Sequence, residues 1–126
     1  MQEIVNTLKG RLTGIAPSGW TGAIVYAELS EDLCETSFYF TMPRNKKIRC
    51  YELCKKGVAE EFIDQMLDGI RDLLFPLWQK DQKERPWTNC TIVLNVDGSF
   101  TVDYDNTNLD EGSYEYRKIW TNKYLK

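Results

Sequence analysis

The stretch PWTNCTIVLNVDGSFTVDYD, residues 86–105, decides the fold because two runs of alternating side chains flank an Asp-Gly pair at 97–98. An Asp-Gly pair in this setting predicts a β-hairpin. A two-residue loop would place Leu94 opposite Thr101 and mix apolar with polar side chains on both faces, which makes that register unfavourable. A three-residue loop, 96–98, with the glycine at positive φ as a bulge, pairs apolar with apolar residues instead. The sequence therefore predicts the three-residue loop.

This register gives the hairpin one apolar and one polar face. The apolar pairs, which we expect to be buried, are Leu94 with Phe100, Ile92 with Val102 and Cys90 with Tyr104. The other face carries Asn89, Thr91, Val93, Asn95, Thr101, Asp103 and Asp105. Polar residues that alternate with buried ones are typical of the solvent side of a sheet. We therefore expect an exposed polar face that needs no catalytic explanation.

Three more strands are expected upstream of this hairpin. Residues 23–29 and 35–42 are strand-like runs separated by the acidic turn 30–32, which predicts another hairpin. Residues 46–53 follow a break in the pattern and predict a third strand. The surrounding segment 44–56 has six basic side chains against the single acid Glu52. Edge strands often carry such charge because it discourages pairing with other molecules, and a nucleic-acid or partner contact is the alternative.

Three helices are expected around the sheet, over residues 3–13, 58–75 and 113–124, where apolar residues recur at helical spacing. Pro76 is expected to kink or end the central helix, and Ser113 to cap the last one. The apolar stripe of the central helix consists of Phe62, Met66, Ile70, Leu73, Leu74 and Leu77, and the docking side of the last helix of Tyr116, Ile119, Trp120 and Tyr124. The predicted fold is α+β, an antiparallel sheet of about five strands covered by an N-terminal, a long central and a C-terminal helix.

Length and composition predict one domain that spans residues 1–126. A chain of this length, with 42% hydrophobic and 13% aromatic residues, can bury a core of its own. The sequence has no apolar run of membrane-spanning length, and its first residues, MQEIVNTLKGRL, do not resemble a secretory leader. We therefore expect a cytoplasmic protein with no membrane partner.

The residue types that carry most catalytic chemistry are missing or scattered. The sequence contains no histidine, which removes the commonest general base and the commonest metal ligand. Its glycines are too irregularly spaced for a phosphate-binding loop. The four cysteines are expected to be free thiols in a reducing compartment, with two disulfides or zinc binding by Cys50 and Cys54 as the alternatives. We therefore expect neither catalysis nor a metal or other cofactor.

Acidic side chains are the most prominent polar feature of the chain, whose net charge is −3. From Asp97 to Tyr116 there are six acids and no lysine or arginine. A surface of one sign attracts a partner of the other sign. The first candidate partner-binding set is therefore Asp97, Asp103, Asp105, Asp110 and Glu111. The second candidate set, on the outer face of the central helix, is Glu60, Glu61, Asp64 and Asp68.

Several aromatic motifs occur in a particular order along the chain. In the second half these are Pro86-Trp87-Thr88-Asn89, Asp97-Gly98-Ser99-Phe100, Asp103-Tyr104-Asp105 and the run YEYRKIWTNKYL at 114–125. In the first half they are Pro17-Ser18-Gly19-Trp20, Tyr26-Ala27-Glu28 and Phe38-Tyr39-Phe40. The order and spacing of these motifs resemble the YezG-like immunity (antitoxin) family. The resemblance implies a bacterial cytoplasmic protein without catalytic activity. Such a protein binds and silences a nuclease toxin encoded beside it, and the family motifs assign no contact residues.

Charge and the resemblance favour the same function. A nuclease holds phosphates on a basic surface, which an acidic protein can block. One alternative is a small hydrolase in which Asp103 and Asp105 divide the acid and base roles. Another is a nucleic-acid-binding module that uses the basic segment 44–56, although the acidic pI near 5.0 disfavours direct binding to nucleic acid.

Overall fold

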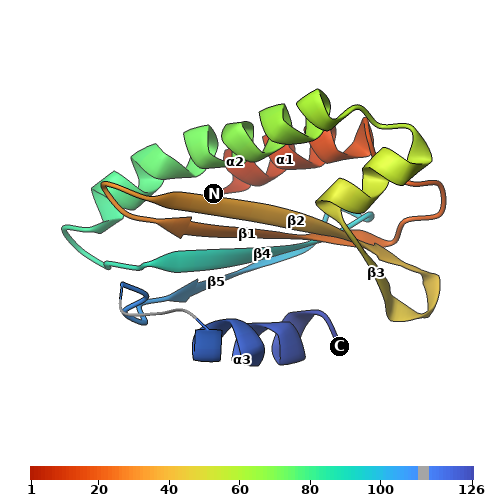
Figure 1. Cartoon of the computed structure of the whole chain (residues 1–126). Helices are drawn as coiled ribbons and strands as arrows, with labels where there is room; N and C mark the ends of the chain where they lie inside the picture. Colours follow the sequence, from red (N-terminus) through yellow and green to blue (C-terminus); the bar gives the residue numbers. More distant parts are fainter. Residues whose placement is uncertain (111–113) are drawn as a thin grey trace.

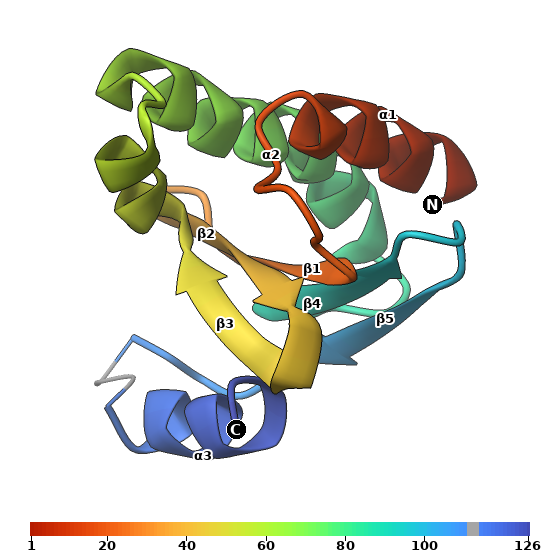
Figure 2. The same ribbon diagram turned by 90° about the vertical axis from the view of Figure 1, so that its right-hand side faces the viewer.

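A five-stranded antiparallel sheet with the strand order β3-β2-β1-β4-β5 forms the centre of the molecule. The structure, a computed structural model, describes residues 1–110 and 114–126. Helices α1 and α2 cover one face of the sheet and α3 covers the other (Figures 1 and 2). The helices are α1 (Gln2–Thr13), α2 (Glu60–Asp81) and α3 (Tyr114–Tyr124), and the strands are β1 (Gly22–Leu29), β2 (Cys34–Met42), β3 (Lys46–Arg49), β4 (Asn89–Asn95) and β5 (Phe100–Asp105). This architecture confirms the predicted α+β fold.

The β4–β5 hairpin has the predicted register. Cys90 pairs with Tyr104, Ile92 with Val102 and Leu94 with Phe100. The backbone N–H of Asn95 donates to the carbonyl of Ser99 at 2.9 Å, which closes a loop of three residues. Gly98 has a φ of 95°, the left-handed conformation that the bulge requires. Alternation and turn chemistry were therefore sufficient to fix this part of the sheet.

The main core lies between the sheet and the first two helices. Its largest fully buried side chains include Leu8 and Leu12 from α1, Phe38 and Phe40 from β2, and Ile63, Ile70 and Leu74 from α2. Strand β1 is buried on both faces, because helices lie above and below it. On the predicted apolar side of the hairpin, Tyr104 remains 48% exposed, since β5 forms the edge of the sheet.

The central helix differs from the prediction at both ends. Proline 76 does not end α2, which continues to Asp81. Leu74 and Trp78, on either side of the proline, are both buried, so packing holds the helix together across it. Proline prevents the usual hydrogen bond to the carbonyl of Asp72, but that residue is exposed and water can bond it instead. At the other end, Phe62 was wrongly placed in the apolar stripe, because Ile63 is buried and Phe62 is 59% exposed.

The predicted third strand is shorter than expected. Strand β3 ends at Arg49, and a 3-10 helix over Cys50–Lys56, η2, replaces its second half. Glu52 explains this change, because its carboxylate accepts the backbone N–H of Arg49 at 3.1 Å, as in a helix capping box. Strand β3 is an edge strand, as the basic character of the segment predicted.

Candidate partner-binding surfaces

The polar face of the β4–β5 hairpin is covered by α3, so the expectation of a solvent-exposed face is wrong for its centre. Asn89 and Thr91 are buried there. The indole N–H of Trp120 donates to Thr91 Oγ1 at 2.8 Å, and the hydroxyl of Tyr116 donates to Asn89 Oδ1 at 2.6 Å. The polar side chains of the strand thus satisfy the polar ends of aromatic residues from the helix.

Docking of α3 uses one aromatic side of the helix. Trp120 is 7% exposed and packs against Tyr26 and Tyr39, with ring centroids 5.0 and 5.7 Å away. Burial, and to a lesser degree the charge of Asp105, raises the pKa of Tyr116 to about 12. Its phenol is therefore protonated at neutral pH and can act as a donor. Ile119 was predicted on this side but is 65% exposed, and the predicted cap at Ser113 lies outside the described residues.

Asp103 and Asp105 share the face that α3 covers, and both are engaged within the protein. The hydroxyl of Tyr124 donates to Asp103, and Lys123 Nζ lies 3.9 Å from the same carboxylate. Asp105 Oδ1 accepts the backbone N–H of Thr107 at 2.8 Å. These contacts give the two carboxylates structural roles in holding α3 and the following loop. Nothing in these contacts favours the hydrolase alternative.

The other members of the first acidic set lie at different ends of the molecule. Asp97 lies in the β4–β5 turn, where hydrogen bonds from the hydroxyl and backbone N–H of Ser99, helped by the charge of Lys9, lower its pKa. Asp110 follows the opposite end of β5, a strand of six residues that spans roughly 20 Å (Figure 1). Glu111 lies outside the described residues. The sequence segment is continuous, but the four described acids do not form a single patch.

The second acidic set is arranged along one helix. Glu60, Glu61, Asp64 and Asp68 are all exposed on α2 and, one turn beyond, Asp72 continues the row. Arg71 lies beside the last two acids, with nitrogens 3.5 Å from Asp68 and 3.2 Å from Asp72. The hydroxyl of Tyr51 donates to Asp64 at 2.5 Å, a contact that raises the tyrosine pKa to about 12. The side chains of this row therefore form an exposed acidic surface on a single helix, α2.

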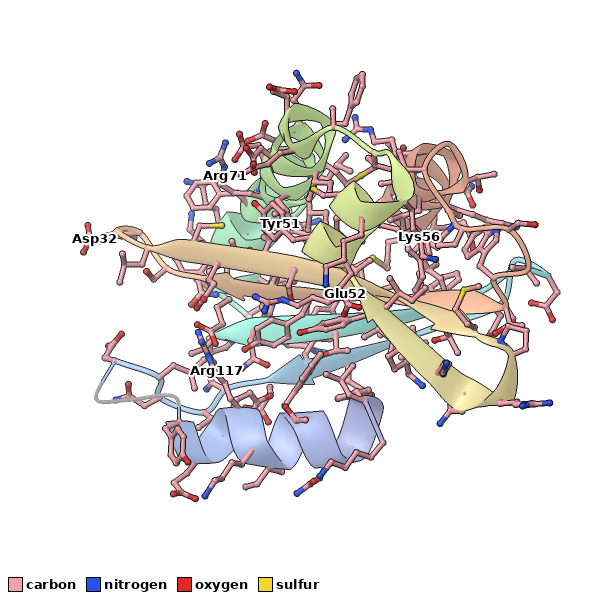
Figure 3. All side chains as sticks on the ribbon, turned by 45° about the vertical axis from the view of Figure 1, so that its right-hand side comes forward. Asp32, Tyr51, Glu52, Lys56, Arg71 and Arg117 are labelled. Carbon is pink, nitrogen blue, oxygen red and sulfur yellow. The ribbon has the colours of Figure 1, made fainter. Side chains whose placement is uncertain are left out.

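A cavity of about 670 Å³ opens at the end of the sheet near Asp110. Its walls come from the β1–β2 turn, the loop 106–110 and the last turns of α2. Figure 3 shows Asp32 at the tip of the β1–β2 turn, with Arg71 on the α2 side and Arg117 on the α3 side. The residues that line the cavity are Glu28, Leu29, Ser30, Leu33, Cys34, Glu35, Trp78, Gln82, Trp87, Thr88, Asn106, Asn108, Leu109 and Asp110.

Sequence reasoning missed the residues that organise this end of the molecule. Arg117 of α3 pairs with Glu35, and its Nη2 lies 3.6 Å from Glu28 Oε1. Glu28 also accepts the hydroxyl of the buried Tyr26 at 2.6 Å. Leu33, in the β1–β2 turn, is 78% exposed. The sequence does contain one signal, an apolar residue directly after two acids in a turn, but it does not indicate which elements fold against that turn.

Cys50 and Cys90 are buried, Cys34 and Cys54 are exposed, and all four carry free thiols. Within residues 1–110 and 114–126, no three His, Cys, Asp or Glu side chains are grouped so that they could hold a metal ion. In the same part of the chain, none of the helices has the length and apolar character needed to cross a membrane.

Comparison with known proteins gives a consistent match over the full chain. Residues 1–126 match the model of the family described as Immunity protein YezG-like. A relative named Immunity protein YezG from Bacillus spizizenii strain W23 is 25% identical over 132 residues, which cover 99% of this chain and 82% of the relative. A relative of the same name from Bacillus subtilis strain 168 is 27% identical over 132 residues, covering 99% of this chain and 87% of the relative. The chain therefore belongs to the YezG-like immunity protein family.

Proposed function

We propose that this protein is a cytoplasmic immunity protein that neutralises one nuclease toxin, encoded next to its own gene. It binds the nuclease domain and covers the basic surface that would otherwise hold nucleic acid. Inhibition by coverage needs neither catalysis nor a cofactor, and residues 1–126 act as a single binding domain. Membership of an immunity-protein family is the observation that carries this proposal.

Electrostatics explains how an acidic protein can act in this way. A nuclease binds phosphates through lysine and arginine side chains, and carboxylates at similar positions can take the place of phosphates. The row Glu60, Glu61, Asp64 and Asp68 is exposed along α2. The row remains one surface although Arg71 lies 3.5 Å from Asp68, whereas Asp97, Asp103 and Asp105 are spread along β5 and its turn and are bonded within the protein. We therefore infer that the α2 row and Asp110 contribute more to the contact than Asp97, Asp103 and Asp105 do.

The test is inhibition of the neighbouring nuclease by the purified protein. The nuclease domain is mixed with increasing amounts of this protein, and the cleavage of DNA and RNA substrates is measured. We expect activity to fall to background near one equivalent, because a blocked surface cannot bind substrate. A nuclease domain from an unrelated locus is the control and should keep its activity. If the protein binds no nuclease from its own locus even at low salt, this function is excluded.

A further inference from the structure

The floor of the cavity at the end of the sheet is apolar and firmly held. The two tryptophans in its lining, Trp78 and Trp87, are almost fully buried. The indole N–H of Trp78 donates to the carbonyl of Trp87 at 2.9 Å, and that of Trp87 donates to Asp81 Oδ2 at 3.0 Å. Only a small part of each indole faces the cavity, but these contacts keep its base rigid, which lowers the entropic cost of binding there.

Acidic residues form part of the walls of this cavity. Glu28, Glu35 and Asp110 line the cavity, and the described lining residues include no lysine or arginine. Arg117 offsets part of this charge through its contacts with Glu28 and Glu35. The adjoining turn adds exposed Glu31 and Asp32. The cavity therefore combines an apolar floor with an acidic rim.

The acidic rim continues onto α2. The hydroxyl of Thr36 donates to the carbonyl of Leu67 at 3.0 Å, which fixes β2 against the middle of that helix. Cys34 lies in the cavity wall, where burial and, to a lesser degree, the nearby charges of Asp68 and Asp72 raise the pKa of its thiol. Arg71 lies between these two acids and offsets part of their charge. The acidic row of α2 thus leads to the mouth of the cavity.

Hydrogen bonds hold the backbone of Leu33 in place on the rim. The backbone N–H of Ser30 donates to the carbonyl of Leu33 at 2.9 Å, and the hydroxyl of Ser30 accepts the N–H of Leu33 at 2.9 Å. On the opposite wall, the hydroxyl of Thr88 donates to the carbonyl of Thr107 at 2.6 Å. Single exposed apolar residues are common, but one that is fixed beside an apolar cavity matches the pattern of an interface anchor.

We propose that this cavity and Leu33 form the anchoring site for the nuclease domain, and that the cavity takes a lysine or arginine side chain from it. The apolar stem of such a side chain packs against the accessible apolar lining, chiefly Leu33 and Leu109, and its charged end meets the acidic residues of the rim. The inference rests on the proposed function and specifies which surface performs it. The acidic row of α2 then serves as the flank of the interface.

Two exposed cysteines allow this surface to be tested without any substitution. Cys34 lines the cavity, whereas Cys54 lies on η2, away from the cavity lining. The protein is alkylated with N-ethylmaleimide, alone and with the neighbouring nuclease domain, and labelling at each cysteine is followed by mass spectrometry. Burial raises the pKa of the Cys34 thiol, so each cysteine is compared only with itself.

The expected result is selective protection of Cys34. With the nuclease domain at about tenfold above its Kd, roughly one-tenth of the protein is free, so labelling of Cys34 should slow about tenfold. Labelling of Cys54 should be unchanged. Equal protection of both thiols, or protection of Cys54 alone, would contradict the proposal. Concentration-dependent protection of Cys34 in the protein alone would assign the cavity to a second copy and also contradict it.

A matched pair of substitutions tests whether the nuclease contacts this cavity or the first turns of α2. Leu33→Lys and Phe62→Lys each place a positive charge at an exposed apolar position, so neither should disturb the fold, which circular dichroism checks. Leu33→Lys should weaken nuclease binding on the order of 10- to 100-fold, as loss of an anchor does, and Phe62→Lys clearly less, as expected beside the flank of the interface. The reverse order would place the contact at the start of α2.

Failure of this inference is distinguishable from failure of the proposed function. If the unmodified protein does not bind the nuclease domain, the function itself is wrong and the anchoring site falls with it. If it binds and inhibits, but Cys34 stays reactive and Leu33→Lys binds equally well, only the assignment of this surface is wrong. Calorimetry with the same nuclease domain measures the Kd of the unmodified protein and of the Leu33→Lys and Phe62→Lys variants.

Discussion

Gly98 shows how a single residue fixes the strand register on which α3 depends. Its φ of 95° is unfavourable for a residue with a side chain, especially a β-branched one. A Cβ atom there would meet only Lys9 Nζ at 3.6 Å, an ordinary contact, so lack of space is not the reason for the glycine. The cost of substitution comes from the backbone conformation alone.

We therefore predict that Gly98→Val lowers the free energy of unfolding by about 1–3 kcal/mol, the usual cost of a residue held at positive φ. Ser99→Val is the matched control, because it adds the same side chain at the next position without requiring a positive φ. It removes only exposed hydrogen bonds and should cost clearly less. Urea denaturation of both variants measures the difference, and equal losses would show that φ is not the cause.

At the scale of elements, α3 is attached to the sheet through one aromatic side. Trp120 is the buried residue of α3 (Tyr114–Tyr124), and its N–H is bonded to Thr91. Trp120→Ala should therefore destabilise the protein by about 3–5 kcal/mol. Ile119→Ala, one residue away but exposed, should change stability by less than about 0.5 kcal/mol. Chemical denaturation followed by circular dichroism tests the pair, and similar small losses would mean that α3 is not firmly docked.

The elements also show what the sequence could predict and what it could not. Alternation around Asp97-Gly98 was sufficient to predict the hairpin register, because a slip of one residue in the strand pairing would move apolar side chains to the polar face. The same alternation could not reveal that α3 covers the polar face. Asn89 and Thr91 give the same polar pattern whether they bond water or, as here, the Tyr116 hydroxyl and the Trp120 indole N–H. Packing across Pro76 also overrode the local rule that proline ends a helix.

The candidate sites illustrate the same limit. The density of acids in 97–116 is a property of the chain, but β5 carries Asp97 and Asp110 to opposite ends of the molecule. The α2 acids were predictable as one surface, because helical spacing places them on one side. Leu33 and the cavity could not be predicted, because their walls come from segments far apart in the sequence.

At the scale of the whole molecule, charge is unevenly distributed. The acids of α2 continue to the β1–β2 turn and the cavity, whereas basic residues gather on β3 and toward the end of the chain. Lys47, Lys123 and Lys126 line a second, smaller cavity there. A nuclease with a basic cleft would be attracted to the acidic part and repelled by the basic part. Long-range electrostatics would then orient the encounter before any contact forms.

This arrangement predicts that the association rate, more than the dissociation rate, depends on salt and on where a charge lies. Electrostatic steering can raise association 10- to 1000-fold, roughly, and salt screens it over about 10 Å at 0.1 M. Asp68→Lys and Glu3→Lys change the net charge equally, at exposed positions on α2 and α1. Asp68→Lys should slow association with the neighbouring nuclease domain several times more at low salt, and the two variants should converge at high salt. Stopped-flow fluorescence measures these rates. Equal slowing by both variants would mean that only the net charge matters, and an association rate independent of salt would rule out charge complementarity as the basis of recognition.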